Sequence, residues 1–147
     1  MILIPTKVVS KDYLPVKAYD GSSAAYDLRA EIPEPFTLHP LDRAVISTGV
    51  RIHLPTGMVG LVCPRSGLAL KHGITVLNAP GIIDPGYVDT IGVILINFND
   101  TPYTISPQEK IGQLLIIQNS DIKLSTDLNF ETNTVRGLNG YGSSGKI

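Results

Sequence analysis

The sequence predicts an all-β domain, either a sandwich, a barrel or a jelly roll, with one short helix. Fourteen glycines and eleven prolines divide the 147 residues into short apolar segments, as in proteins whose strands are joined by tight turns. No long segment repeats its apolar residues about every 3.6 positions, as an amphipathic helix would. The length suits one domain with its own core, and the sequence shows no internal repeat.

The predicted strands are apolar segments bounded by glycine, proline or polar turn residues. They cover residues 45–52, 57–63, 73–77, 91–98, 103–105 and 111–118. Residues 93–96 are apolar at every position, whereas a strand with one face in water alternates. We therefore expect both faces of that strand to be covered, one of them by a neighbouring subunit.

The one predicted helix covers residues 66–73. Ser66 could cap its N-terminus and Gly73 its C-terminus, with Lys71 and His72 in the last turn, where the helix dipole favours cations. Arg65 and Ser66 at this N-terminus form a candidate anion site. An ordinary cap beside a solvent-facing arginine is an equally good interpretation.

Composition narrows the class of protein. The net charge is −1 and charged residues make up 17% of the chain, which argues against a nucleic-acid partner and favours buried subunit interfaces. Cys63 is the single cysteine, so no intrachain disulfide can form, and its apolar neighbours indicate a small core residue. No apolar run is long enough to span a membrane, and the N-terminus lacks the features of a signal peptide, so a cytoplasmic location is expected.

The C-terminal residues 136–147 combine four glycines and two serines with Arg136, Tyr141 and Lys146. Glycine allows backbone N–H groups to approach a ligand, arginine suits phosphate oxygens, and an aromatic ring can stack on a base. This composition suits a segment that closes over a nucleotide polyphosphate. Taken alone, however, the tail slightly favours a flexible and inert segment, because terminal Gly/Ser stretches are most often both.

Residues 78–87 lie between two predicted strands, where they could form a hairpin. The exposed backbone of such a hairpin could recognise a base through main-chain hydrogen bonds. Asp84 is the one carboxylate there, and on its own it is better explained as a residue of an Asp-Pro-Gly turn. Asp27 lies in a neutral stretch and could be a strand-end acid. Gln113 interrupts an apolar strand, so its amide needs a partner if buried, either a ligand or the backbone of a neighbouring strand.

The order of these segments resembles the five sequence motifs of the trimeric dUTPase family, from residue 24 to residue 145. The spacing Asn78-x-x-Gly81-x-Ile83-Asp84-x-x-Tyr87 is the most diagnostic part. The resemblance implies a distorted jelly-roll β-barrel, a domain at 1–135 and a C-terminal arm at 136–147. It also implies a homotrimer with active sites shared between subunits, and no nucleic-acid or membrane partner.

The implied reaction is hydrolysis of dUTP to dUMP and pyrophosphate, with Mg²⁺ held mainly by the substrate phosphates. Asp84 matches the residue that orients and deprotonates the attacking water. Because a carboxylate is a weak base, we expect positioning of the water to supply much of its contribution. Gln113 and Arg136 match further catalytic positions, and Asp27 matches an acid that contacts the metal through water.

Substrate contacts follow from the same resemblance. Tyr87 matches the aromatic ring that packs under the deoxyribose and leaves no room for a 2′-hydroxyl. Asn78 and the backbone of residues 81–87 match the groups that recognise uracil. The full set of implied substrate-binding residues is Arg65, Ser66, Gly67, Asn78, Gly81, Ile83, Tyr87, Lys110, Tyr141, Gly142, Ser143 and Ser144.

The chain departs from the usual family pattern at Ala25, Asp89-Thr90, Gly112 and Asn139. The nearest alternative function is dCTP deamination on the same fold, but the catalytic glutamate of that family would fall at Ile94, which cannot transfer a proton. A dUTP-gated regulatory protein is the other alternative, and a regulatory protein partner stays open.

Overall fold

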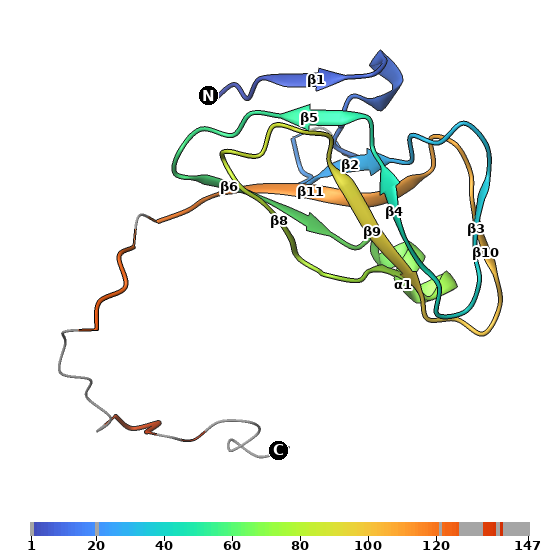
Figure 1. Cartoon of the computed structure of the whole chain (residues 1–147). Coiled ribbons are helices and arrows are strands. Elements are labelled where there is room, and N and C mark those ends of the chain that lie inside the picture. Colours follow the sequence, from blue (N-terminus) through green and yellow to red (C-terminus); the bar gives the residue numbers. More distant parts are fainter. Residues whose placement is uncertain (1, 20, 121, 127–133, 138, 140–147) are drawn as a thin grey trace.

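The computed structural model describes residues 2–19, 21–120, 122–126, 134–137 and 139. In these residues the regular secondary structure is mostly strand, with one α-helix and one short 3-10 helix (Figure 1). The elements are β1 (Thr6–Val8), η1 (Lys11–Tyr13), β2 (Tyr26–Arg29), β3 (Phe36–Leu38), β4 (Arg43–Ser47), β5 (Val50–Ile52), β6 (Met58–Cys63), α1 (Ser66–His72), β7 (Ile74–Val76), β8 (Gly81–Ile83), β9 (Gly92–Asn97), β10 (Tyr103–Ile105) and β11 (Lys110–Gln118).

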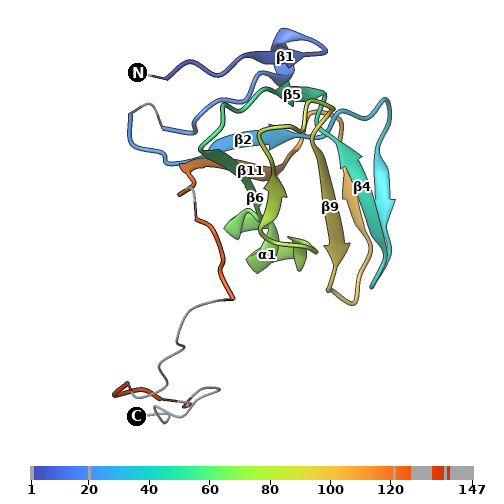
Figure 2. The ribbon, with the colours of Figure 1, turned by 60° about the vertical axis from the view of Figure 1, so that its left-hand side comes forward.

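The strands form a four-stranded sheet in the order β2-β11-β6-β8 and a three-stranded sheet in the order β4-β9-β7. Two further ribbons pair β1 with β5 and β10 with β3, and all pairs are antiparallel. The sheets turn about a common interior in both ribbon views (Figures 1 and 2). Leu28, Val93, Leu95 and Ile105 have no exposed surface there, so the predicted jelly-roll-like β fold is confirmed.

Five of the six predicted strands are confirmed within a residue or two of their ends. The single strand predicted at 45–52 is wrong, because the chain breaks into β4 and β5 at Thr48-Gly49. Gly49 has a φ of 64°, and a Cβ there would lie 2.6 Å from Val9 Cγ2. Only glycine fits this turn, which sends β5 away to pair with β1.

The predicted helix is confirmed with one correction at its start. Arg65 is the N-cap residue, Ser66 is the first helical residue, and no side chain caps the N-terminus. Ser66 as cap was therefore wrong. Gly73 ends the helix in the left-handed conformation, with φ 65°, as expected for a C-terminal glycine.

Strand β9 buries one face in the core of the chain. Val93 and Leu95 are fully buried, whereas Ile94 on the other face is half-buried and pairs with Val45, which is 68% exposed. Within the described residues, then, the second face is only partly covered. In the same residues no helix is long and apolar enough to cross a membrane.

The hairpin predicted at residues 78–87 is wrong. Strands β7 and β9 pair with each other, but the segment between them leaves their sheet. Its central strand, β8, joins the edge of the other sheet by pairing with β6. This crossing places a long loop, residues 84–91, beside the end of β8.

Candidate active site

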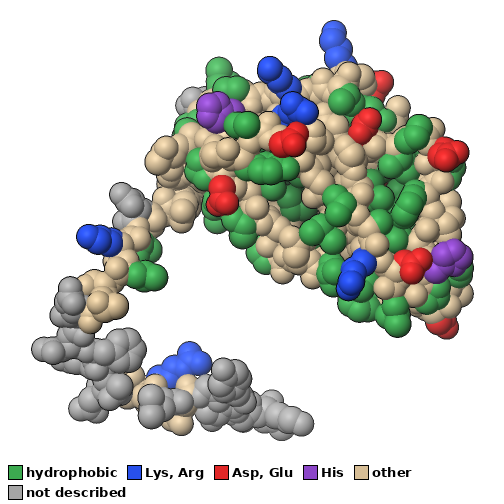
Figure 3. All heavy atoms as spheres, in the orientation of Figure 1, with side chains coloured by type: hydrophobic (Ala, Val, Ile, Leu, Met, Phe, Trp, Pro, Cys, Tyr) green, Lys and Arg blue, Asp and Glu red, His purple; other side chains and the backbone are tan. Residues whose placement is uncertain are grey.

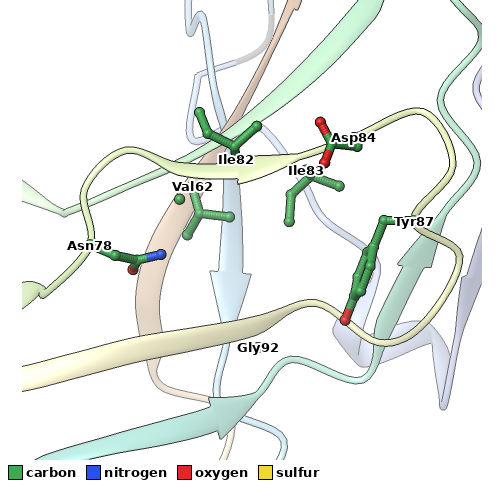
Figure 4. A pocket seen from close by; sticks show the side chains of 8 residues that line it. Val62, Asn78, Ile82, Ile83, Asp84, Tyr87 and Gly92 are labelled. Atoms are coloured by element: carbon green, nitrogen blue, oxygen red, sulfur yellow. The ribbon is translucent and has the colours of Figure 1, made fainter.

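A pocket of about 210 Å³ opens beside β8 and the loop that follows it (Figure 4). All five residues of the most diagnostic motif line it: Asn78, Gly81, Ile83, Asp84 and Tyr87. Val62, Ile82 and Gly92 complete the lining. Sequence spacing and tertiary structure therefore agree on the residues of this site.

Gly81 allows the amide of Asn78 to lie against the strand. A Cβ on Gly81 would be 3.3 Å from Asn78 Nδ2 and 3.4 Å from Val62 Cβ, tighter than ordinary van der Waals contact. The register Val62↔Gly81 fixes this approach. The pocket thus presents one side-chain amide next to a strand backbone, a combination suited to the hydrogen-bonding edge of a base.

Asp84 follows directly after the last residue of β8 and is exposed. Its carbonyl accepts the Tyr87 N–H at 3.1 Å, which closes the turn. Its carboxylate makes no side-chain hydrogen bond or ion pair with any residue that the structure describes. The carboxylate is therefore available to a water molecule or ligand in the pocket.

Tyr87 stands on the side of the pocket away from Asn78, with its hydroxyl directed toward the strand of Gly92 (Figure 4). The ring is 41% exposed. Its hydroxyl donates a 2.8 Å hydrogen bond to the Thr90 carbonyl. This hydrogen bond fixes the orientation of the Tyr87 ring, which forms one side of the pocket.

A second cluster of charged residues forms where β2 and β11 meet the start of α1. Asp27 is 8% exposed. One carboxylate oxygen lies 3.3 Å from Arg65 Nε and the other 2.6 Å from Lys110 Nζ. The contact with Lys110 lacks hydrogen-bond geometry, so we treat it as an ion pair. Arg65 Nη1 also donates a 3.0 Å bond to the Lys110 carbonyl.

Gln113 supports the same cluster from β11. Its Nε2 donates a 2.8 Å hydrogen bond to the Pro64 carbonyl, so the backbone partner considered from the sequence is confirmed. The register Gln113↔Cys63 brings the two strands together at this point. Ser66 and Gly67, on the first turn of α1, are exposed, and a Cβ on Gly67 would meet nothing within 4 Å. This end of the sheet can accept an anion.

Asp84 and the cation cluster of Asp27, Arg65 and Lys110 lie at opposite ends of β6, although the pocket itself extends along β6 as far as Val62. The register Gly60↔Ile83 places Asp84 beside the start of β6, whereas Arg65 follows its end. With about 3.3 Å per strand residue, Asp84 and Arg65 are separated by roughly 15–20 Å along the sheet. A single chain therefore does not place Asp84 beside its own cation cluster.

The structure does not bring Arg136 to either cluster. Its Nε donates a 3.0 Å bond to the Asn139 carbonyl, and residues 134–137 lie away from the barrel in both ribbon views (Figures 1 and 2). Tyr141, Gly142, Ser143 and Ser144 lie outside the described residues.

The dUTPase family model matches residues 12–145. The chain belongs to the dUTPase family. The deoxyuridine 5′-triphosphate nucleotidohydrolase of Clostridium novyi is 43% identical over 145 residues, 99% of each chain, and that of Chlamydia pneumoniae is 45% identical over 135 residues, 90% of each. The solved dUTPase of Staphylococcus bacteriophage 80alpha with dUpNHpp has a TM-score of 0.85 at 28% identity, over 99% of both chains.

Within this dUTPase-family fold, two side-chain groups beside the site were not found from the sequence. Tyr103 on β10 hydrogen-bonds the Glu109 carboxylate and contacts the His72 ring with centroids 4.9 Å apart. Burial, and then the bond to Glu109, raises the pKa of the Tyr103 hydroxyl above its usual range. The other group joins Arg51 to the Tyr87 loop. The sequence gives no signal for the contacts of His72 with Tyr103 and of Arg51 with Thr90, because each joins residues that are far apart in the chain.

Proposed function

We propose that this chain hydrolyses dUTP to dUMP and pyrophosphate, with water attacking the α-phosphorus. The observation that carries this proposal is the pocket that joins Asn78, a free Asp84 carboxylate and the Tyr87 ring. Asp84 orients the attacking water and accepts its proton, and fixing the water next to the phosphorus supplies much of the rate gain.

The same pocket selects the nucleoside. The Asn78 amide and the backbone of β8 bind the edge of uracil, with little room for an added methyl group. The Tyr87 ring packs under the deoxyribose and excludes a 2′-hydroxyl. Rejection by missing space is modest for each added group, typically about 10- to 200-fold.

The triphosphate needs cations that one chain does not place beside its own Asp84. We propose that Arg65, Ser66, Gly67, Gln113 and Lys110 of a second copy complete the site, in a homotrimer. Two observations support this arrangement: the separation along β6, and the exposed apolar side chains. Val45 is 68% exposed, Ile82 56% and Phe98 62%, and apolar side chains are spread across the face that carries β9 and β4 (Figure 3). Arg136 and the arm that follows it close over the phosphates.

Mg²⁺ is the proposed cofactor, held mainly by the substrate phosphates and waters. The described residues contain no group of three or more His, Cys, Asp or Glu side chains that could hold a metal. Both Asp27 oxygens face cations, so Asp27 fits a role toward the metal only through water. When bound, the ion neutralises charge on the phosphates. A mutant dUTPase of phage phi11 holds a structural Mg(II) ion.

The alternatives from the sequence are not favoured. Deamination requires a proton-transferring group near the base, whereas Ile94 lies on β9 and Asp84 is the carboxylate that lines the pocket. The phage 80alpha protein is described among phage dUTPases that control transfer of virulence genes. A regulatory partner and a cytoplasmic location stay predictions for this chain.

The test is pyrophosphate release with Mg²⁺ from dUTP, dCTP, dTTP and UTP, with the purified Asp84→Asn variant measured in parallel to detect contaminating phosphatases. We expect release from dUTP alone and its loss in the variant. Equal release from all four nucleotides, or none from dUTP with folded protein, would refute the proposal. Light scattering of the same sample should give the mass of a trimer.

A further inference from the structure

Arg51 on β5 does not line the pocket, but it holds the loop that carries Tyr87. Its Nη2 lies 3.2 Å from the Asp89 Oδ1 atom. Its Nε donates a 3.2 Å hydrogen bond to Thr90 Oγ1. One guanidinium thus contacts two consecutive loop residues through two different nitrogens. The single ammonium group of lysine cannot reproduce this two-point contact.

Thr90 connects the Arg51 contacts to the Tyr87 ring, which lines the pocket. Its carbonyl accepts the Tyr87 hydroxyl at 2.8 Å, and its N–H donates a 2.7 Å bond to the same Asp89 Oδ1 atom that Arg51 contacts. One residue later, the Ile91 N–H donates to the Val50 carbonyl at 2.8 Å. A continuous set of polar bonds therefore runs from β5 through Thr90 to the ring.

At its end the loop is fixed to the core, because Ile91 is fully buried and its carbonyl accepts a 2.7 Å hydrogen bond from Thr48 Oγ1. The preceding part has less support: Val88 is 58% exposed and lines a hollow of about 510 Å³ that also involves β1 and β5 residues, Arg51 among them. A segment with few apolar contacts beneath it is easily displaced. The position of Asp89, and of the Tyr87 ring, is therefore sensitive to these polar bonds.

We propose that Arg51 is a positioning residue for nucleotide selection: by fixing Asp89 and Thr90 it holds the Tyr87 ring where the ring excludes a 2′-hydroxyl. The inference rests on the proposed function of Tyr87 as the wall beneath the sugar. It also gives a role to Asp89-Thr90, where the chain departs from the pattern usual in the family. Arg51 itself is not among the residues that line the pocket.

The effect should appear in selectivity and hardly in stability. The Arg51 and Asp89 side chains are 55% and 73% exposed, and exposed ion pairs contribute little to folding. UTP and dUTP share their base and triphosphate and differ only at the sugar. The ratio of their kcat/KM values therefore isolates the wall that Tyr87 forms.

The first experiment measures this dUTP-to-UTP ratio in Arg51→Ala and Arg51→Lys, with Arg43→Ala as the matched control. Arg43 is also an exposed strand arginine, on β4, and forms no ion pair with any residue that the structure describes. From the size of exposed ion-pair effects, we expect both Arg51 variants to lower the ratio roughly two- to five-fold. Arg43→Ala should leave it unchanged. A ratio equal to wild type in both Arg51 variants would overturn the proposal.

The second experiment tests whether Arg51 acts through the tyrosine hydroxyl. Tyr87→Phe keeps the ring and removes its bond to Thr90. If the restraint passes through that bond, Arg51→Ala causes no further loss of selectivity in the Tyr87→Phe background. Additive losses in the double variant would overturn the proposed route.

Tyr87→Ala separates this inference from the proposed function on which it rests. A normal ratio in Tyr87→Ala would refute the sugar wall and the Arg51 proposal together. A lowered ratio in Tyr87→Ala with a normal ratio in Arg51→Ala would refute only the role of Arg51. We expect both ratios to fall, with the larger change in Tyr87→Ala.

Discussion

Asp27 and Asp84 are both lone acids in neutral stretches of sequence, yet the fold gives them opposite surroundings. Asp27 lies inside β2, 8% exposed, with each carboxylate oxygen facing a cation. Asp84 lies one residue beyond β8, exposed, and its carboxylate has no partner among the described side chains.

What a carboxylate can do depends on whether neighbouring cations already neutralise it. The Asp27 charge holds Arg65 and Lys110 in place, and removing it would leave two cations without a counter-charge. The Asp84 carboxylate has no such partner among the described residues, so it is available for its proposed role of orienting water and accepting a proton. Under the proposed function, one end of the sheet arranges cations and the other presents the reactive carboxylate.

The largest expected effect comes from Asp84→Asn. The amide cannot accept the proton from water, so kcat should fall roughly 10²- to 10⁴-fold, the usual contribution of general acid–base catalysis. The free energy of unfolding should change by less than about 0.5 kcal/mol, because the side chain is exposed and unpartnered. Steady-state kinetics and thermal unfolding measure the two quantities. A large loss of stability would show that Asp84, like Asp27, holds the structure.

In contrast to Asp84→Asn, the Asp27→Asn substitution should mainly lower the free energy of unfolding. Breaking a fully buried ion pair costs about 3–5 kcal/mol, but Arg65 and Lys110 are about a third exposed. Screening by water lowers the expected loss to about 1–2 kcal/mol. Urea unfolding checks this value, with the exposed Asp100→Asn as the control that should match wild type. Equal stability of the two variants would contradict the structural role of Asp27.

The smallest expected effect concerns Tyr103, beside the cation cluster. Its pKa is raised in the folded state by burial, then by the bond to Glu109. A raised folded pKa means that stability is complete below the unfolded value of about 10 and declines as pH rises above it, because only the unfolded chain releases the proton. Tyr103→Phe should therefore flatten the alkaline loss of stability. Parallel pH profiles of wild type and variant would contradict this assignment.

The β class, and the seven strands β4 to β7 and β9 to β11, could be predicted from the sequence because these strands overlap apolar segments bounded by turn residues. Strands β1, β2 and β3 fall outside the predicted segments. Gly49 divides the strand predicted at 45–52, where its left-handed φ and the close approach of Val9 admit only glycine. Likewise β8 leaves its sequence neighbours to pair with β6, and this choice places the Asp84 pocket at a sheet edge.

Five of the eight residues that line the pocket could be predicted from the sequence, because Asn78, Gly81, Ile83, Asp84 and Tyr87 lie within ten residues of one another. Val62 and Gly92 come from other strands and were not predicted, and the chemistry assigned to the five stays a prediction. The tertiary structure alone decided which charges are paired and which are free. The ion pairs of Asp27 and the grip of Arg51 on the Tyr87 loop join residues from different strands. Such contacts depend on strand pairing and register, which no local pattern encodes.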